Sequence, residues 1–146
     1  MTRIVLAAAA VALAVTAVAA QSDPIAARKA LMKKNGDEAK VGAAMAKGEA
    51  PFDLVKAQAI FTTFADSAAK APALFPDNSK TGGETAALPA IWENKADFEA
   101  RFTKFGAAAK AAQSAVKDLD SLKATWGGLV KDNCGGCHEK YRQKKS

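Results

Sequence analysis

The chain has 146 residues, of which 49% are hydrophobic, and a formal net charge of +6 at pH 7. This length accommodates one domain with a sizeable core. Because basic and acidic residues are interspersed rather than gathered in blocks, the positive charge does not indicate nucleic-acid binding.

The first 20 residues have the pattern of a secretory signal peptide. Arg3 precedes an alanine-rich apolar run that ends in the small residues Val18 and Ala20, which is typical of cleavage after the run. A membrane anchor is the alternative, but the run is slightly short, weakly hydrophobic and not followed by charges that stop transfer. We therefore expect residues 1–20 to be removed and residues 21–146 to form one domain in the bacterial periplasm, without membrane insertion.

The remaining sequence predicts an all-α fold. It is rich in Ala and Lys, has few β-branched residues and contains no alternating apolar runs, which favours helices over strands. Helix-breaking residues divide it into four helical segments. We expect these at about residues 22–46, 51–70 and 89–117, and from residue 118 into the C-terminal region.

The first two segments each have one face suited to a core. The first begins at Ser22-Asp23-Pro24, a polar cap followed by a proline in the first turn. The second ends before Ala71-Pro72, because a residue that precedes proline disfavours the helical conformation. In the first segment one face is lined at helical spacing by Ile25, Arg28 and Met32, although Arg28 could also be a solvated charge. In the second segment an apolar stripe is formed by Leu54, Phe61, Phe64 and Ala68.

Residues 72–88 connect the second and third segments. Two prolines and the pair Gly82-Gly83 predict an ordered loop rather than a helix. A loop this long in a small domain is usually functional or disordered. Because Leu74 and Phe75 are apolar, we expect this loop to pack onto the helices.

The third and fourth segments have the clearest core patterns. In the third, apolar residues recur at intervals of three, four or seven, as in the a and d positions of a bundle. They are Ile91, Phe98, Phe102, Phe105, Ala109, Ala112 and Val116. The fourth segment begins at Asp118 or Asp120, either of which can cap it. Its apolar residues are Leu122, Trp126, Leu129 and Val130.

Four helices with mostly short connections predict an up-down-up-down antiparallel four-helix bundle. Within the fourth segment, Gly127 and Gly128 lower the helix propensity by about 1 kcal/mol each relative to Ala. We expect them to admit a neighbouring helix.

Cys134-Gly135-Gly136-Cys137-His138 follows on the fourth segment and has the Cys-x-x-Cys-His pattern of c-type haem attachment. On a helix these three side chains project from one face within one turn. Two thiols at this spacing form thioethers with the haem vinyl groups, and the adjacent imidazole is a good axial ligand of iron. We therefore predict one covalent haem c on the last helix, with Cys134 and Cys137 as its attachment points and His138 as proximal ligand.

Other uses of two cysteines at this spacing are possible. A closed structural zinc site needs four ligands, and the chain has only two cysteines and one histidine. A redox-active dithiol usually accompanies a βαβ pattern, which the sequence lacks. A short-loop disulfide and a chance match are further alternatives.

The sequence defines the sixth ligand of the iron, on the side opposite His138, less clearly than the proximal ligand. His138 is the only histidine, which excludes two histidine ligands from one chain. Met32 is the candidate sixth ligand, because it lies one turn after Arg28 on the same face and an arginine can pair with a haem propionate. The alternative for Met32 is core packing, which we also expect for Met45.

The C-terminal cations Lys140, Arg142, Lys144 and Lys145 allow two interpretations. They complement the negative end of the last helix dipole, or they form a docking patch for an acidic partner.

The whole domain resembles the class II c-type cytochromes, above all the cytochrome c′ family. Beyond the haem motif, the resemblance rests on short stretches spread over the chain. These are Arg28-Lys29-Ala30-Leu31-Met32, Gly48, Pro51-Phe52-Asp53, Leu74-Phe75-Pro76, Thr81-Gly82-Gly83, Pro89-Ala90-Ile91-Trp92 and Tyr141-Arg142.

The resemblance implies a periplasmic haem protein that forms a homodimer through its first two helices. It also implies that Arg28, Lys29, Ile91 and Arg142 contact the haem. In typical cytochromes c′ the iron is five-coordinate and the residue matching Met32 is apolar and shields the open face. In the related low-spin cytochromes c-556 a methionine at this position binds the iron, and both possibilities stay open for Met32.

We therefore predict a one-electron carrier with an unidentified redox partner protein. Binding of nitric oxide or carbon monoxide at a five-coordinate haem is the alternative. An enzyme such as a haem peroxidase is not expected, because no second histidine exists to act as acid or base.

Overall fold

The computed structural model describes residues 23–144, so the expected signal peptide lies outside the described residues. The α-helices are α1 (Pro24–Lys47), α2 (Leu54–Lys70), α3 (Ala90–Glu93), α4 (Lys95–Ala115), α5 (Leu119–Leu129) and α6 (Gly136–Tyr141). A π-helical turn, Val130–Gly135, joins α5 to α6 directly. None of the helices between residues 23 and 144 is long and apolar enough to cross a membrane.

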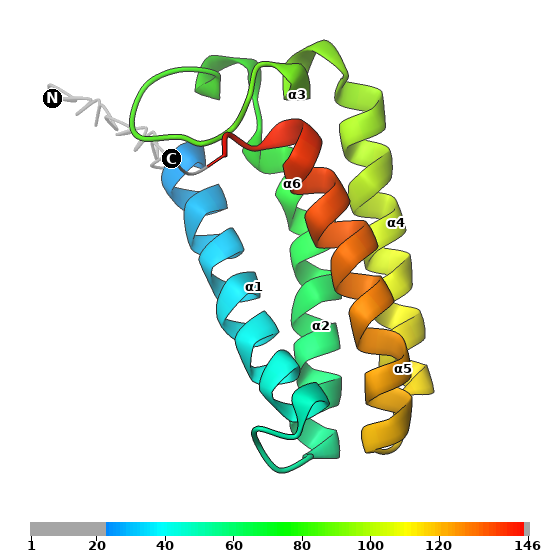
Figure 1. Cartoon of the computed structure of the whole chain (residues 1–146). Helices are drawn as coiled ribbons and strands as arrows, with labels where there is room; N and C mark the ends of the chain where they lie inside the picture. Colours follow the sequence, from blue (N-terminus) through cyan, green and yellow to red (C-terminus); the bar gives the residue numbers. More distant parts are fainter. Residues whose placement is uncertain (1–22, 145–146) are drawn as a thin grey trace, which may run out of the picture.

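The helices run alternately up and down (Figure 1). α1 and α4 descend in the view, while α2 and the continuous rod of α5, the π turn and α6 ascend. α2 packs most extensively against α4, and α1 packs against α2 and α5. This arrangement is the predicted up-down-up-down four-helix bundle. It brings α6, the start of α1 and the loop after α2 to the same end (Figure 1).

Side-chain caps explain where the helices begin. The Asp23 carboxylate accepts a hydrogen bond from Ile25 N at 2.9 Å, and Pro24 occupies the first turn of α1. Asp53 caps α2 in the same way. Asp118 and Ser121 form a reciprocal capping box at the start of α5, which satisfies backbone donors that a helix start leaves free.

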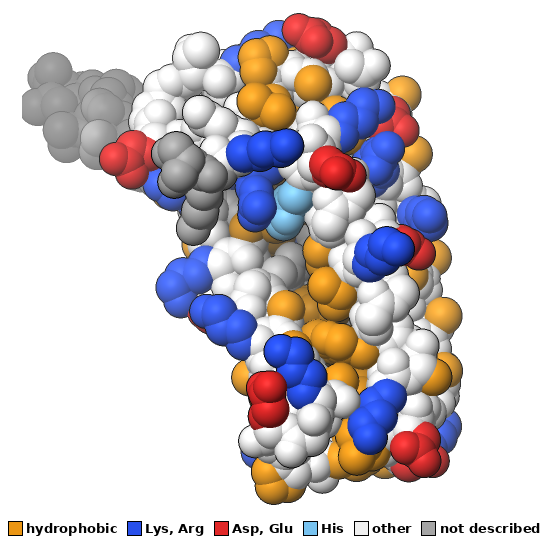
Figure 2. Space-filling model, in the orientation of Figure 1, with side chains coloured by type: hydrophobic (Ala, Val, Ile, Leu, Met, Phe, Trp, Pro, Cys, Tyr) orange, Lys and Arg blue, Asp and Glu red, His pale blue; other side chains and the backbone are white. Residues whose placement is uncertain are grey.

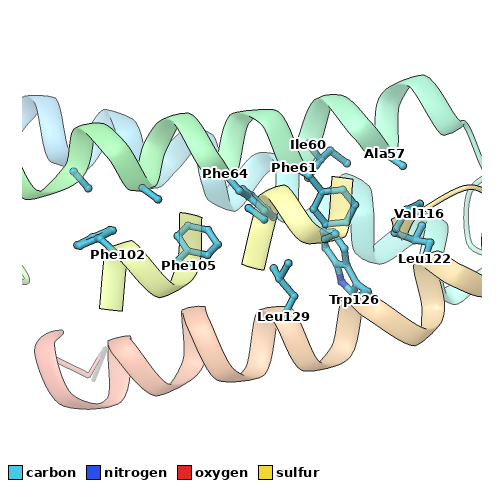
Figure 3. Packing of buried hydrophobic residues seen from close by; sticks show 14 of the residues in the cluster. Ala57, Ile60, Phe61, Phe64, Phe102, Phe105, Val116, Leu122, Trp126 and Leu129 are labelled. Atoms are coloured by element: carbon cyan, nitrogen blue, oxygen red, sulfur yellow. The ribbon is translucent and has the colours of Figure 1, made fainter. Parts of the chain in front are cut away.

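Most residues of the predicted core faces are buried (Figure 3), whereas Met32, Leu54 and Val130 are half-buried. All seven residues of the third-segment seam, from Ile91 to Val116, are buried. Phe61 and Phe64 on α2 lie against Trp126 on α5, with ring centroids 6.0 and 6.2 Å apart. Phe75 from the long loop is also buried, and its ring centroid lies 4.7 Å from that of Phe98. The loop therefore packs onto the bundle as expected.

The third segment differs from the prediction of one helix. It divides into α3 and α4 at Asn94, whose backbone leaves the helical region with φ −126° and ψ 47°. The Asn94 side chain donates to Ala90 O at 3.3 Å, and such local bonds compete with a continuous helix. The spacing still predicted the burial of Ile91, because the core face continues across the break.

Two more segments differ in local geometry. The predicted loop contains two short 3-10 helices, Ala71–Leu74 and Asp77–Ser79. The fourth segment contains the π turn, which the apolar spacing did not reveal. A π turn inserts one residue into an α-helix and is frequently found at functional sites.

The expectation that Gly127 and Gly128 admit a neighbouring helix is wrong. Both are exposed, and beyond their own stretch of helix no atom of the described residues lies within 4 Å of a Cβ built at either position. The close approach is at Gly42 on α1 instead. A Cβ there would lie 2.0 Å from the Trp126 ring, so only glycine lets α1 approach α5 this closely.

Candidate functional site

A cavity of about 400 Å³ lies at the end of the bundle that holds α6. Its walls come from α1, α2, α4, the long loop and the C-terminal rod. Most of the lining is apolar, including Phe64, Phe98, Phe102 and Phe105. Cys134, Cys137 and His138 all line it. The structure therefore brings the predicted motif to one cavity, although Cys134 lies in the π turn and the other two in α6.

The three motif side chains are half-buried, and both thiols are free. Burial raises the pKa of the Cys134 thiol, and the neighbouring Cys137 raises it further. Burial and, to a smaller extent, the Arg142 guanidinium lower the pKa of His138. The imidazole is therefore neutral at pH 7, as an axial ligand must be.

The surroundings of the two thiols bear on two of their other possible uses. Between residues 23 and 144, no group of three or more His, Cys, Asp or Glu side chains is placed to hold a metal ion. The same part of the chain has no β-strand beyond an isolated bridge between Ala87 and Arg142. The βαβ context of a redox-active dithiol is therefore not present in it.

The two methionines of α1 lie in different surroundings. Met32 is half-buried and lines the cavity that also contains His138. Met45 is 2% exposed and belongs to the hydrophobic core. Met45 therefore packs in the core, as predicted. Of the two methionines, only Met32 lies where its side chain can contact a bound haem.

Arg28 is buried, with 4% of its surface exposed, and lines the cavity. Its Nη1 donates to Ser79 Oγ at 2.8 Å and to Leu74 O at 3.3 Å. Its Nη2 donates to Ser79 O at 3.0 Å and to Thr85 Oγ1 at 2.8 Å. All four terminal N–H groups thus bind the long loop. Bidentate pairing of a propionate with Nη1 and Nη2 would therefore require some of these hydrogen bonds to the loop to break. The Nε–H group takes part in none of the four bonds and stays available to a propionate.

The other predicted haem contacts also line the cavity. Ile91 is buried in its wall. Lys29 is exposed at its edge, with its ammonium 3.8 Å from the Glu84 carboxylate. Arg142 follows α6 in an extended conformation and is held to the loop through its neighbours: Leu88 N donates to Tyr141 O at 3.0 Å, and Gln143 N donates to Ala86 O at 2.8 Å.

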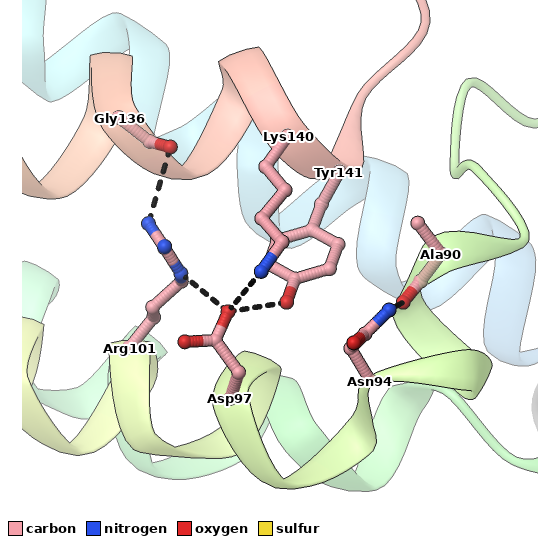
Figure 4. A network of polar contacts seen from close by, with 7 residues as sticks. All are labelled: Ala90, Asn94, Asp97, Arg101, Gly136, Lys140 and Tyr141. Carbon is pink, nitrogen blue, oxygen red and sulfur yellow. Dashed lines mark hydrogen bonds and ion pairs between the residues drawn. The ribbon is translucent and has the colours of Figure 1, made fainter.

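An Asp97-centred network holds α6 against α4 (Figure 4). The Asp97 carboxylate accepts hydrogen bonds from the Tyr141 hydroxyl, from Arg101 Nε at 2.9 Å and from Lys140 Nζ at 2.9 Å. Arg101 Nη1 also donates to Gly136 O, inside the Cys-x-x-Cys-His motif, at 3.2 Å. These donors hold the pKa of Asp97 well below its usual range. Sequence reasoning missed this network, because the bonds that join α4 to α6 span 35, 43 and 44 residues of the chain.

Two asparagines on the cavity wall were also missed. The side-chain oxygens of Asn35 and Asn133 are buried without a hydrogen-bond partner among the described residues. Buried polar atoms are nearly always paired in a complete structure. These two atoms, the cavity volume and the two thiols beside a neutral imidazole fit a site completed by a bound cofactor.

Comparison with known proteins agrees with this geometry. The profile of the family described as Cytochrome C′ matches residues 23–142. A cytochrome c′ of Rhodopseudomonas palustris is 54% identical over 127 residues, which cover 87% of this chain and 86% of the relative. The chain belongs to the cytochrome c′ family. Members of this family bind haem c covalently, and the two cysteines near the C-terminal helix are present here.

Two further similarities cover most of the molecule. A cytochrome c-556 of the same organism is 37% identical over 149 residues, which cover 99% of each chain. The solved structure of a cytochrome c′ from Rhodopseudomonas palustris superimposes with a TM-score of 0.82. It covers 86% of this chain and 100% of that one, at 54% identity. Relatives named cytochrome c-556 and cytochrome c′ are therefore both similar to this chain.

Proposed function

We propose that this protein is a periplasmic one-electron carrier. The observation that carries the proposal is the cavity that Cys134, Cys137 and His138 line together with Met32 of α1. The two thiols would hold the haem as thioethers, and His138 would bind its iron on the proximal side. When bound, the haem supplies a one-electron couple whose potential depends on its axial ligands and surroundings.

The protein's own residues would keep the surroundings of the haem unchanged while the iron alternates between its two oxidation states. The Asp97 network holds α6 and the Gly136 carbonyl in place, so that the imidazole keeps one orientation. The phenylalanines of the cavity exclude water from the cofactor face. Because the chain contains no second histidine and the family consists of cytochromes, we propose electron exchange without catalytic turnover.

Gas binding is the second candidate, and the apolar lining of the cavity favours it. A small uncharged gas such as nitric oxide or carbon monoxide prefers such surroundings, provided that Met32 leaves the iron open. In that case Met32 fills space on the open face instead of binding.

Absorption spectra in both oxidation states, with and without carbon monoxide, separate the two. A low-spin spectrum with the long-wavelength band of methionine–histidine ligation, unchanged by the gas, supports the carrier and excludes gas binding. A high-spin spectrum that shifts on adding carbon monoxide excludes Met32 as a ligand and supports gas binding. Met45→Ala is the matched control for Met32→Ala, because Met45 lies in the core and its removal should lower stability without changing the spectrum.

We further propose export and dimerisation. Export is supported by the signal-peptide pattern of residues 1–20. A homodimer through α1 and α2 is supported by Val41 and Val55, which are large apolar side chains with 45% and 77% of their surface exposed on these two helices.

A further inference from the structure

His138 lies on a wall between the cofactor cavity and solvent. It lines the buried cavity, and it also lines an open groove of about 880 Å³ on the outer surface. Arg142 lines both as well. Figure 2 shows the single histidine at the surface, at the upper end of a hollow with hydrophobic side chains in its floor, and Lys and Arg side chains nearby. The rate of electron transfer falls steeply with distance. A molecule bound in this groove would be separated from the iron by little more than the His138 side chain, so it could exchange electrons quickly.

The groove carries cations that have no acidic partner. Lys104, Lys131, Arg142 and Lys144 line it and are exposed, and none of them takes part in an ion pair among residues 23–144. By contrast, Lys33 and Lys40 are paired with a carboxylate. Unpaired cations around a hollow keep a positive potential there, which attracts anions.

The described C-terminal cations thus divide between two surfaces, while Lys145 lies outside the described residues. Lys140 points away from the groove to Asp97, whereas Arg142 and Lys144 line the groove. Lys104 from α4 and Lys131 from the π turn join them, although they are far from the C-terminus in sequence.

We propose that this groove is the docking surface for an acidic redox protein, which exchanges one electron with the haem next to His138. The proposal rests on the proposed carrier function. Asp132 and Glu139 also line the groove, so its charges are mixed. The two carboxylates can pair with basic groups on a protein surface, whereas they would repel the uniform phosphates of a nucleic acid.

Two double variants test the groove on the holoprotein. Lys104→Glu with Lys131→Glu reverses two groove charges. Lys110→Glu with Lys123→Glu makes the same change in net charge on exposed lysines of α4 and α5 that do not line the groove. Oxidation of each reduced protein by hexacyanoferrate(III) is followed by stopped flow. The protein loses one electron, hexacyanoferrate(III) becomes hexacyanoferrate(II), and no bond or proton is exchanged.

At low ionic strength we expect the groove variant to react about tenfold more slowly than the wild type, and the control variant to differ much less. The difference should vanish at high salt, where screening shortens the range of charge interactions to about 3 Å at 1 M. Equal slowing of both variants would overturn the proposal, because net charge alone would then explain it. If no protein exchanges electrons with the reagent at all, the carrier function itself is wrong.

Binding is measured separately with hexacyanochromate(III), a paramagnetic anion that leaves the haem oxidation state unchanged. It should broaden the amide resonances of groove residues in the wild-type protein, and an oligo-glutamate peptide should shift the same resonances. Broadening centred on another face would overturn the proposal. Stronger shifts with a short DNA duplex than with the peptide would contradict a protein partner.

Discussion

Replacing Gly42 by alanine tests the packing that joins α1 to the rest of the bundle. The new Cβ would lie 2.0, 2.4 and 2.6 Å from three carbon atoms of the Trp126 ring, whereas carbon atoms pack at about 3.5–4.0 Å. The ring cannot move aside freely, because it is buried against Phe61 and Phe64. α1 must therefore move away from α5.

The size of the effect follows from two opposing terms. Overpacking a core costs about 1–3 kcal/mol, and an overlap this large belongs at the upper end. Alanine regains about 1 kcal/mol of helix propensity relative to glycine. Gly42→Ala should therefore lower the free energy of unfolding by about 2 kcal/mol. Gly127→Ala is the matched control, since its Cβ meets no neighbour, and it should raise the free energy by about 1 kcal/mol.

Urea unfolding of the holoproteins, followed by circular dichroism, measures both changes. With about 1–3 kcal/mol per molar urea for small proteins, the two midpoints should differ by about 1 M or more. Equal midpoints, or a Gly42→Ala variant more stable than the wild type, would refute the close packing of α1 on α5.

The remaining predictions concern the network, the attachment and the dimer. Because its native contacts depress the pKa of Asp97, its ionised form stabilises the fold above the usual aspartate range and this stability is lost as the pH falls through the depressed value. Asp97→Asn should thus be less stable than the wild type at pH 7 in urea unfolding, with a smaller difference at pH 3; a constant difference argues against the network. Cys137→Ala should retain at most one thioether, and with Cys134→Ala also present haem should be lost on denaturing gel electrophoresis; haem that stays bound to the double variant contradicts the attachment. Val55→Lys should shift a dimer to monomer in analytical ultracentrifugation, and an unchanged dimer excludes this part of α2 from the interface.

The parts of the fold that depend on regular spacing could be predicted from sequence. The seam from Ile91 to Val116 and the caps at Asp23 and Asp118 follow from local rules, and the structure confirms them. The haem motif is also local, which is why its three residues could be named together.

Features that depend on distant contacts could not be predicted. The need for glycine at Gly42 arises from Trp126, a residue on another helix, whereas the Gly127-Gly128 pair was conspicuous in sequence and contacts nothing. Arg28 was expected to face a propionate, but whether loop oxygens occupy its donors depends on how residues 74–85 fold back. The π turn was missed because it inserts one residue without changing which residues are apolar.

The attachment of haem through the C-terminal motif is tested most directly by mass spectrometry of a tryptic digest. Cleavage after Lys131 and Lys140 releases residues 132–140, which contain Cys134, Cys137 and His138. We predict that this peptide carries the mass of one haem and that neither thiol reacts with an alkylating agent. A peptide without haem, alkylated at both cysteines, would contradict the account.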